Sequence, residues 1–460
     1  MPRTLHTVLA CPKPDYTARR NGKVLLVWKD VPYWMVVDED FRAFLDELDG
    51  TRTLAEVARS RPAWLAARRG IARAARTLVA SGVLRGTTTP PEASAPSATP
   101  IENIAINITK RCNLRCGFCY YLPNLAKEAP NELAAEEMIA VIESARPFCS
   151  RKASLVLLGG EPLLEPEKVL AVAAFAARRR MTCVLSTNGT LASDDFARGA
   201  RAARLQVQVS LDGHTAELND AVRGKGVFER AVRGIRTLAA HKVHTIASLV
   251  CHAGNAAFIE DFYALVRSLG ADEARFIPLK RIGGGRTGDF APARMRDLVA
   301  TAGSLFAAHP EFLRMAGRDC VSILANTCRY SVRRRSCGTG LQTFLLDADG
   351  GLYPCLNTNL PEFMIANVRD PAFDFARVWK DAPVLRRVRA QTAASALGGT
   401  CAGCAVRAWC LGGCRGEAHS AHGALDRPAP NCADLKAAIL EMFWMLADRP
   451  GVMKKATFVC

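Results

Sequence analysis

One short stretch governs the interpretation of this sequence: Thr109-Lys-Arg-Cys112-Asn-Leu-Arg-Cys116-Gly-Phe-Cys119-Tyr. Its three cysteines have the spacing C-x3-C-x2-C and directly follow a strand-like run over 104–108. Three thiolates leave one iron of a four-iron cluster without a protein ligand, and such an iron can bind and activate a small molecule. A zinc knuckle is the alternative, although structural zinc usually takes four protein ligands from C-x2-C pairs. The stretch therefore predicts a reactive iron–sulfur centre.

Length, cysteine use and charge limit the classes of protein to consider. With 460 residues the chain is long enough for two to four domains. No apolar run reaches the length of a membrane span, and the first residues lack the layout of a secretory signal. Seventeen cysteines, many at metal-like spacings, fit a reducing compartment, so we expect a cytoplasmic protein without membrane contact. The net charge of +17 favours an acidic partner, either a peptide or a nucleic acid.

Residues 1–86 are expected to fold as a first unit, a hairpin followed by three helices. The strands are predicted over 22–29 and 33–37, and the helices after Asp38, from Thr51 or Thr53, and over 63–81. The edge of such a hairpin can receive an extended peptide as an added strand. The helical half is strongly basic, with Arg52, Arg59, Arg61, Arg68, Arg69, Arg73, Arg76 and Arg85. A solvated basic face without a ligand and a DNA-binding winged helix are the alternatives.

Residues 87–100 are rich in Pro, Ser, Thr and Ala and predict an extended linker that leaves the first unit as a separately folded arm. Residues 101–310 then alternate strand and helix. We expect strands over 104–108, 155–158, 183–186, 206–211, 245–250 and 275–278, and helices over 134–145, 167–179, 228–240 and 258–269. Six such repeats predict parallel strands with right-handed crossovers, and hence an α/β fold with a partial (β/α)6 barrel. Chemistry in such barrels gathers at the carboxyl ends of the strands.

Polar and glycine-rich turns follow successive predicted strands. Gly159-Gly-Glu-Pro162 follows the second strand, Ser186-Thr-Asn-Gly-Thr190 follows the third, and Ser210-Leu-Asp-Gly213 ends the fourth. Each alone would be ordinary turn chemistry. Together with the cysteine loop they resemble the pattern of the radical S-adenosylmethionine (radical SAM) enzymes, from the first strand to the fourth.

That resemblance implies a 4Fe–4S cluster on Cys112, Cys116 and Cys119 and a binding site for S-adenosylmethionine (SAM). The family's Gly-Gly-Glu-Pro loop contacts the methionine amino group, and its matching positions here are Gly159, Gly160, Glu161 and Pro162. The other matching positions are Ser210 and Arg223 for the methionine carboxylate, Thr187 and Asn188 for the sugar or the methionine, and Phe118 and Tyr120 beside the adenine. Gly283-Gly-Gly-Arg286 is either a further lining segment or a flexible loop.

The last part, residues 311–460, holds most of the remaining cysteines. Their order, with C-x2-C-x5-C-x3-C over 401–414, resembles the SPASM extension of radical SAM enzymes, which carries two auxiliary 4Fe–4S clusters. The resemblance assigns Cys337, Cys355 and Cys414 to the first auxiliary cluster, and Cys401, Cys404, Cys410 and Cys432 to the second. Cys328, with Cys320 behind it, is the nearest candidate for a fourth ligand of the first cluster; otherwise that cluster has an open iron. A zinc ribbon over 401–414 is the alternative, and a C-terminal helix is expected over 433–448.

The first unit resembles the PqqD-like domain, a winged-helix recognition element for ribosomally synthesised peptides, through Leu48-Asp-Gly-Thr-Arg-Thr-Leu-Ala-Glu-Val57. The combined resemblances imply an enzyme that reductively cleaves SAM to methionine and a 5′-deoxyadenosyl radical. They further imply that this radical starts the oxidative modification of a precursor peptide, such as a C–S or C–C cross-link. A flavodoxin- or ferredoxin-type protein is the expected electron donor.

Three other functions stay open. The first is maturation of a protein side chain, since sulfatase-maturing relatives share a run close to Cys119-Tyr-Tyr-Leu122. Those relatives place an acidic base where Leu356 stands here, which counts against the same chemistry. The second is oxidation of a small molecule. The third is a non-catalytic, metal-stabilised adaptor that binds nucleic acid, a partner that the radical SAM pattern does not favour.

Overall fold

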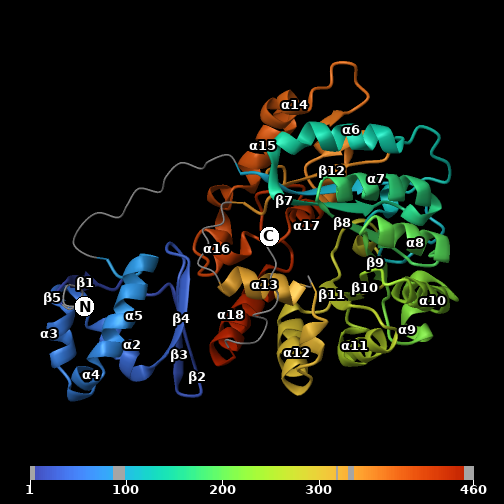
Figure 1. Cartoon of the computed structure of the whole chain (residues 1–460). Helices are drawn as coiled ribbons and strands as arrows, with labels where there is room; N and C mark the ends of the chain where they lie inside the picture. Colours follow the sequence, from blue (N-terminus) through green and yellow to red (C-terminus); the bar gives the residue numbers. More distant parts are fainter. Residues whose placement is uncertain (1–5, 86–98, 318–319, 330–335, 450–460) are drawn as a thin grey trace.

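The computed structural model describes residues 6–85, 99–317, 320–329 and 336–449. Its centre is a nine-stranded sheet in the order β11-β10-β9-β8-β7-β6-β12-β13-β14 (Figure 1). The six parallel barrel strands are β6 (Ile101–Asn107), β7 (Cys149–Leu158), β8 (Thr182–Thr187), β9 (Gln206–Ser210), β10 (Thr245–Cys251) and β11 (Glu273–Pro278). All six lie where the sequence predicts strands, which confirms the α/β fold and its partial barrel.

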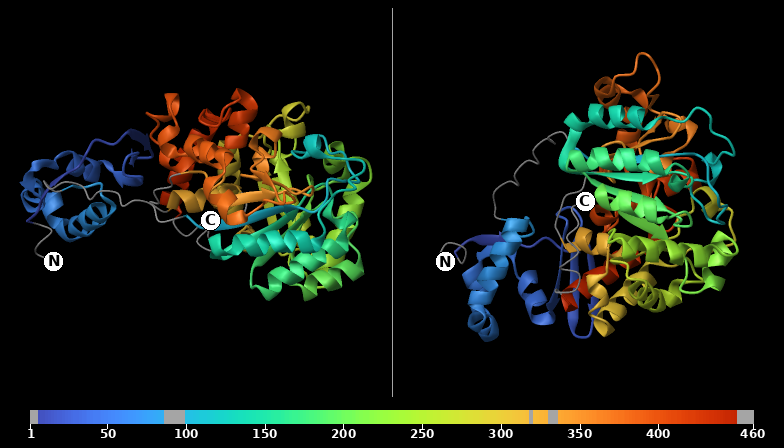
Figure 2. Two further views of the ribbon diagram at one scale, coloured as in Figure 1. Left: turned by 90° about the horizontal axis from the view of Figure 1, so that it is seen from above. Right: turned by 45° about the vertical axis from the view of Figure 1, so that its right-hand side comes forward.

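Helices cover one face of these strands (Figures 1 and 2). They are α6 (Ala135–Ala145), α7 (Pro166–Arg178), α8 (Asp194–Ala202), α9 (Ala216–Arg223), α10 (Val227–Ala240), α11 (Ile259–Ser268) and α12 (Met295–Ala308). In α7, the fully buried residues Val169, Val172, Ala173 and Ala176 recur at helical spacing. Such a stripe fixes which side of the helix packs on the sheet. The four helices predicted within the barrel are all present, at nearly the predicted bounds.

The C-terminal part extends the same sheet. Strand β12 (Thr343–Leu346) pairs in parallel with β6, and β13 (Gly351–Tyr353) and β14 (Ala366–Asn367) follow in antiparallel pairing. The sequence does not predict these strands, because segments of two to four residues carry too little of the alternating pattern. The boundary expected after residue 310 therefore separates two groups of motifs, although one sheet runs through both.

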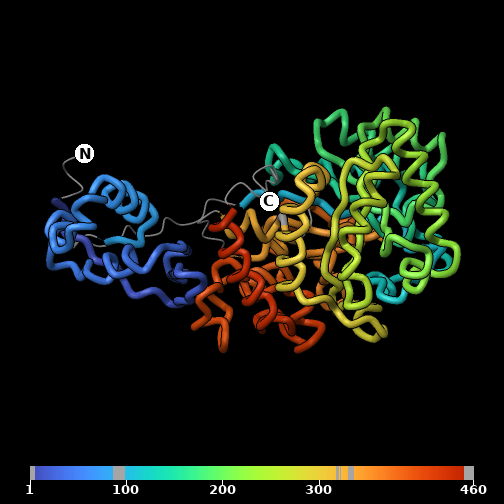
Figure 3. Tube along the Cα trace, turned by 90° about the horizontal axis from the view of Figure 1, so that it is seen from below, coloured from blue at the N-terminus to red at the C-terminus, as the bar shows by residue number. Residues whose placement is uncertain are grey.

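The C-terminal helices are α13 (Cys320–Arg329), α14 (Phe375–Asp381), α15 (Pro383–Thr392), α16 (Arg407–Cys410), α17 (Arg415–His422) and α18 (Cys432–Asp448). The last of these matches the helix predicted over 433–448. It lies between the barrel and the N-terminal unit, beside α12, α13 and β4 (Figure 3). Within the described ranges, none of the helices is long and apolar enough to cross a membrane.

The described part of the N-terminal unit, residues 6–85, contains two small antiparallel sheets and four helices. Strand β1 (Val8–Ala10) pairs with β5 (Asp49–Thr53), and a second sheet has the order β2-β3-β4 (Tyr16–Arg20, Lys23–Trp28, Tyr33–Asp38). The helices are α2 (Glu39–Asp46), α3 (Leu54–Arg59), α4 (Pro62–Ala66) and α5 (Arg68–Ser81). The predicted hairpin corresponds to β3 and β4, whereas β2 was not predicted. The helix predicted over 63–81 is interrupted at Ala67, and Thr53 starts α3 through a capping box with Glu56.

Strand β3 is buried on both faces, which explains its continuous apolar sequence. Val24 and Leu26 pack among the helices of the N-terminal unit, whereas Leu25 and Val27 belong to the main core, together with residues of α18. A strand covered on both sides loses the alternation of polar and apolar residues that a half-exposed strand shows.

The sheet of the N-terminal unit is docked on α18. Trp34 stacks on Phe443 with ring centroids 4.7 Å apart, and its indole N–H donates to the carbonyl oxygen of Cys328 at 2.6 Å. Arg20 donates to both carboxylate oxygens of Glu441, at 2.9 and 2.8 Å. The expectation of a separately folded arm is therefore wrong for this sheet, whose second face needs α18. Linker residues 87–98 lie outside the described part of the chain.

Candidate active site

The cysteine loop and the Gly-Gly-Glu-Pro loop lie against each other above the ends of β6 and β7. The backbone N–H of Gly160 donates to the Thr109 oxygen, and that of Glu161 donates to the Arg111 oxygen, both at 2.8 Å. A Cβ atom on Gly160 would lie 1.9 Å from the Arg111 oxygen, and one on Gly159 would lie 2.5 Å from the Thr109 oxygen. Both glycines are thus required for the close approach of the two loops, whichever ligand they also contact.

Glu161 anchors the Gly-Gly-Glu-Pro loop after β7 to the loop after β8. Its carboxylate, almost fully buried, accepts hydrogen bonds from the Thr187 hydroxyl, from the Asn188 N–H at 2.8 Å and from the Leu163 N–H at 2.9 Å. Burial raises the pKa of Glu161, and these hydrogen bonds oppose that rise. The predicted contact with the SAM ammonium would therefore be an additional bond on a carboxylate that already joins two strand ends. Pro162 begins a short 3-10 turn directly behind it.

Asn188 links the loop after β8 to the cysteine loop. Its side-chain amide donates to the Asn113 oxygen at 2.8 Å, and its own oxygen accepts from the Thr190 N–H at 2.9 Å. Ser210, the last residue of β9, is half-buried at the same edge of the sheet. The structure thus brings the first four predicted loops together.

Arg223 lies between a buried carboxylate and the cysteine loop. Its Nε atom is 2.7 Å from Oδ2 of Asp212, an ion pair without hydrogen-bond alignment, and its Nη1 atom is 4.0 Å from the Cys116 sulfur. Asp212 is fully buried and accepts a second contact from the Val250 N–H at 2.8 Å. Burial raises the pKa of the Cys116 thiol, and the charge of Arg223 opposes that rise. The ion pair holds the buried guanidinium beside the cysteine loop, and its remaining N–H groups are suited to an anionic ligand.

The three thiols of the loop are half-buried and lie near one another. Burial raises the pKa values of Cys112 and Cys116, and raises that of Cys119 to about 11. In each case the negative charge of another cysteine of this loop, or of Asp212, contributes to the rise. Thiols of this kind lose their protons when iron binds. The donor set therefore fits a cluster with three protein ligands and one open iron.

The two aromatic residues of the loop face different surroundings. Phe118 packs edge-on against Phe290, with ring centroids 5.5 Å apart, and lies near the His252 ring at 6.1 Å. Tyr120 instead lies close to Cys119 and to Cys355 of the C-terminal part, since burial first and then the negative charges of these thiols raise its pKa. Phe118 remains suited to the adenine. The adenine contact of Tyr120 stays a prediction.

His252 was not predicted as a site residue, yet its ring lies beside those of Phe118 and Phe290. Its Nδ1 atom accepts the Gly254 N–H at 3.1 Å, so the proton is on Nε2, and burial lowers the pKa of the ring, which keeps it neutral. Among the described residues its Nε2 has no hydrogen-bond partner. A buried donor of this kind is suited to a ligand acceptor. The only sequence signal was its position directly after β10.

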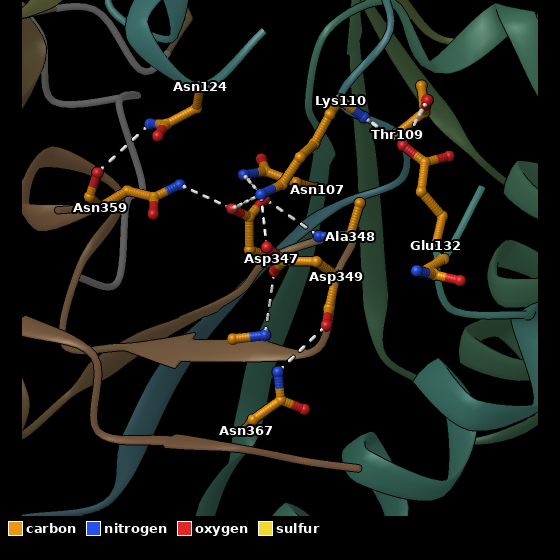
Figure 4. A network of polar contacts seen from close by, with 12 residues as sticks. Asn107, Thr109, Lys110, Asn124, Glu132, Asp347, Ala348, Asp349, Asn359 and Asn367 are labelled. Carbon is orange, nitrogen blue, oxygen red and sulfur yellow. Dashed lines mark hydrogen bonds and ion pairs between the residues drawn. The ribbon is translucent and has the colours of Figure 1, made fainter. Parts of the chain in front are cut away.

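Figure 4 shows a polar network that joins the end of β6 to the C-terminal part. Asp347, almost fully buried, accepts from the Asn107 amide at 2.8 Å, from the Tyr121 hydroxyl at 2.6 Å and from the Asn359 amide at 3.2 Å. Lys110 of the cysteine loop pairs with Asp347 at 3.5 Å and contacts Asp349 as well. Because Asn359 follows Cys355 by four positions, the network fixes one cysteine loop relative to another.

Thiols of the two predicted auxiliary sets act on one another within each set. In the first, the charges of Cys414 and Cys337 act on the Cys355 thiol, whose pKa burial raises to about 11. In the second, the charges of Cys432, Cys404 and Cys401 act on the Cys410 thiol, whose pKa burial raises to about 12. Within the described ranges, no three His, Cys, Asp or Glu side chains lie close enough to hold a single metal ion. Ligands at the corners of a four-iron cluster lie farther apart than ligands of one ion.

Cys328 does not belong to either group. Its thiol lies on α13 in the apolar core, with only 1% of the residue exposed, and burial alone raises its pKa. These surroundings do not favour Cys328 as a fourth ligand, which stays a prediction. The side chain of Cys320 lies outside the described part of the structure.

A partial barrel with an open three-cysteine loop at its carboxyl edge defines an enzyme that binds SAM on an iron–sulfur cluster. A family model for the radical SAM superfamily matches residues 106–267. Mycofactocin maturase MftC of Mycobacterium ulcerans is 31% identical over 338 residues, which cover 71% of this chain and 86% of that protein. The chain belongs to the radical SAM superfamily, and its cofactors are accordingly a 4Fe–4S cluster and SAM.

A second related sequence and two solved structures are also similar to this chain. AdoMet-dependent heme synthase of Methanosarcina barkeri (strain Fusaro) is 28% identical over 351 residues, which cover 72% of this chain and 95% of that protein. The structure of anSMEcpe with bound AdoMet superimposes with a TM-score of 0.60 at 19% identity and covers 78% of this chain and 100% of its own. Streptococcus suis SuiB bound to precursor peptide SuiA also gives 0.60, at 15% identity, and covers 93% of this chain and 99% of its own. These structures confirm the fold.

Proposed function

We propose that this radical SAM enzyme oxidatively modifies a ribosomally synthesised precursor peptide. The observation that carries the proposal is the union of two features in one chain. An open three-cysteine loop beside Arg223 can hold the reactive cluster and SAM, and a basic N-terminal unit is docked on the same body through α18. The related protein MftC is a maturase, and the structure of SuiB contains the precursor peptide SuiA.

The chain's own residues hold and orient the reactants. Cys112, Cys116 and Cys119 would bind the cluster, and Arg223 would bind the methionine carboxylate of SAM. Phe118 and His252 would line the adenine and exclude water from it. When bound, cluster and SAM supply hydrogen abstraction from an unactivated carbon, which is chemistry that side chains alone do not perform. The product would be a C–S or C–C cross-link.

The N-terminal unit is proposed to act as a PqqD-like recognition element for the leader of the peptide. Both faces of its β2-β3-β4 sheet are covered by the chain itself, so a peptide could join this sheet only at an edge. Exposed arginines on α5, including Arg69, Arg73 and Arg76, favour an acidic leader. The unit would hold the leader while the rest of the peptide reaches the barrel.

The two C-terminal groups of cysteines are proposed to hold auxiliary 4Fe–4S clusters. Cys337, Cys355 and Cys414 would bind the first, with one iron free of a protein ligand, and Cys401, Cys404, Cys410 and Cys432 the second. One of them would accept the electron left after the new bond forms, and a flavodoxin- or ferredoxin-type donor would supply the electron that cleaves SAM. We expect the protein in the cytoplasm, where reducing conditions keep these thiols free to bind iron.

The test uses the precursor peptide encoded beside the enzyme's gene, with modification measured by mass spectrometry and binding by fluorescence anisotropy. Arg73→Glu/Arg76→Glu should weaken leader binding by about tenfold or more, and added salt should reduce the difference from the wild type. The matched control is Arg233→Glu/Arg236→Glu on α10, which changes the net charge equally at exposed positions of the barrel and should bind normally. Equal losses in both variants would show that net charge, not the N-terminal unit, attracts the peptide.

A further inference from the structure

The loop that follows β11 contacts both the SAM-binding and the auxiliary cysteines. On one side, the Gly284 N–H donates to the carbonyl oxygen of Cys119 at 2.9 Å. On the other side, the ammonium of Lys280 lies 3.9 Å from the sulfur of Cys414. A Cβ atom on Gly283 would lie 2.2 Å from the Tyr120 oxygen, so this loop packs directly on the cysteine loop. Lys280 therefore lies in the part of the molecule where the two cysteine sites approach each other.

The backbone next to Lys280 is held by helix α17. The N–H of Arg281 donates to Glu417 at 3.2 Å, and the carbonyl oxygen of Arg281 accepts from the Ser420 hydroxyl at 2.9 Å. Glu417 and Ser420 both belong to α17, which begins directly after Cys414. The backbone next to Lys280 and the Cys414 thiol are thus held by the same helix, which keeps the exposed Lys280 side chain within reach of the Cys414 sulfur and of the Glu417 carboxylate.

The Cys414 sulfur has a second donor. The side-chain amide of Asn357 donates to it at 3.4 Å, and a Cβ atom on Gly416 would lie 2.3 Å from the Asn357 oxygen, so α17 packs closely on this residue. The group of Cys401, Cys404, Cys410 and Cys432 differs. Within the described ranges, none of these four sulfurs accepts a hydrogen bond from a lysine, arginine or asparagine side chain, although the charge of Arg415 acts on Cys401 and those of Lys436 and Arg415 act on Cys432.

We propose that Lys280, assisted by Asn357, raises the reduction potential of the cluster held by Cys337, Cys355 and Cys414, and so makes that cluster the electron acceptor. A 4Fe–4S cluster becomes more negative by one charge when it takes up one electron, and a nearby cation or N–H donor to its sulfur stabilises that form. As the carbon radical of the substrate forms the new C–S or C–C bond, the S–H or C–H bond of the second atom breaks, its proton passes to solvent and one electron passes to this cluster. The inference rests on the proposed assignment of an auxiliary cluster to these cysteines.

The experiment measures potentials, not turnover. In the background Cys112→Ala/Cys116→Ala/Cys119→Ala, which retains only auxiliary clusters, each potential is determined by redox titration followed by electron paramagnetic resonance. Lys280→Met should lower the equilibrium constant for reduction of one cluster about tenfold, which is about 59 mV for a one-electron couple. Lys280→Arg keeps the charge and should shift it much less. The other cluster should be unchanged in both variants and should have the lower potential in the parent.

Iron analysis tests the cluster assignment separately from the proposed effect of Lys280 on the potential. Cys337→Ala/Cys355→Ala/Cys414→Ala should lose about four irons; a variant that loses none overturns the cluster assignment and the inference with it. If the irons are lost but Lys280→Met titrates like its parent, the inference alone is wrong and the proposed function stands. Should Lys280→Met assemble poorly, Asn357→Leu gives the second test: it must lower the same potential, and an unchanged value overturns the proposal.

Discussion

Replacement of Arg223 should separate the stability of the barrel from the binding of SAM. Arg223→Ala leaves the carboxylate of Asp212, which is fully buried, without its cation. Removing one partner of a buried ion pair typically costs about 3–5 kcal/mol, because the remaining charge stays desolvated. Loss of a charge-assisted contact to the methionine carboxylate should cost a further amount in binding, about 1.5–3 kcal/mol, or roughly a tenfold to more than a hundredfold loss of affinity.

The double variant Asp212→Asn/Arg223→Met distinguishes the two losses. It removes both charges and keeps the volumes similar, so the urea midpoint should recover most of what Arg223→Ala loses, whereas SAM affinity should stay low. Unfolding is followed by circular dichroism and binding by titration calorimetry, both without oxygen. Near-normal SAM affinity in the double variant would refute the contact between Arg223 and SAM. An unchanged midpoint in Arg223→Ala would refute the argument from the buried Asp212.

Three further predictions concern other parts of the molecule. His252→Phe keeps a buried ring but removes its N–H donor, and titration calorimetry should show SAM affinity reduced about two- to tenfold. Trp34→Ala removes the stacking contact with α18 and should lower stability by about 2 kcal/mol, measured as a lower urea midpoint, together with faster proteolysis of the N-terminal unit. Asp347→Ala leaves buried donors of Asn107 and Tyr121 without an acceptor, at about 1–3 kcal/mol each, which thermal unfolding should detect.

The barrel was predictable because each of its strands carries its own signal. Apolar runs of four to seven residues mark the strands, and the loops at their ends carry residue types that the chemistry needs, such as the C-x3-C-x2-C spacing and the Gly-Gly-Glu-Pro loop. Both signals are local in sequence. The prediction of two C-terminal groups of cysteines rests on the same kind of local signal.

Features that depend on the packing of distant segments were not predictable. The pair of Arg223 with Asp212 depends on how α9 lies over the end of β9. Cys328 was chosen for its nearness to Cys337 in sequence, whereas α13 places its thiol in the apolar core. Likewise, the apolar run of β3 predicted a strand, but not that α18 covers one of its faces through Leu25 and Val27.

The parallel pairing of β6 with β12 has a consequence for synthesis of the protein. Asn107 at the end of β6 and Asp347 just after β12 are 240 positions apart. At about 5–20 residues per second, the ribosome needs roughly 12 to 48 s to reach the second residue after the first. During that time β6 has one unpaired edge, and unpaired edges are templates for aggregation. Conditions that shield nascent chains, such as extra chaperone or lower temperature, should therefore raise the yield of soluble enzyme more than they change its stability once folded.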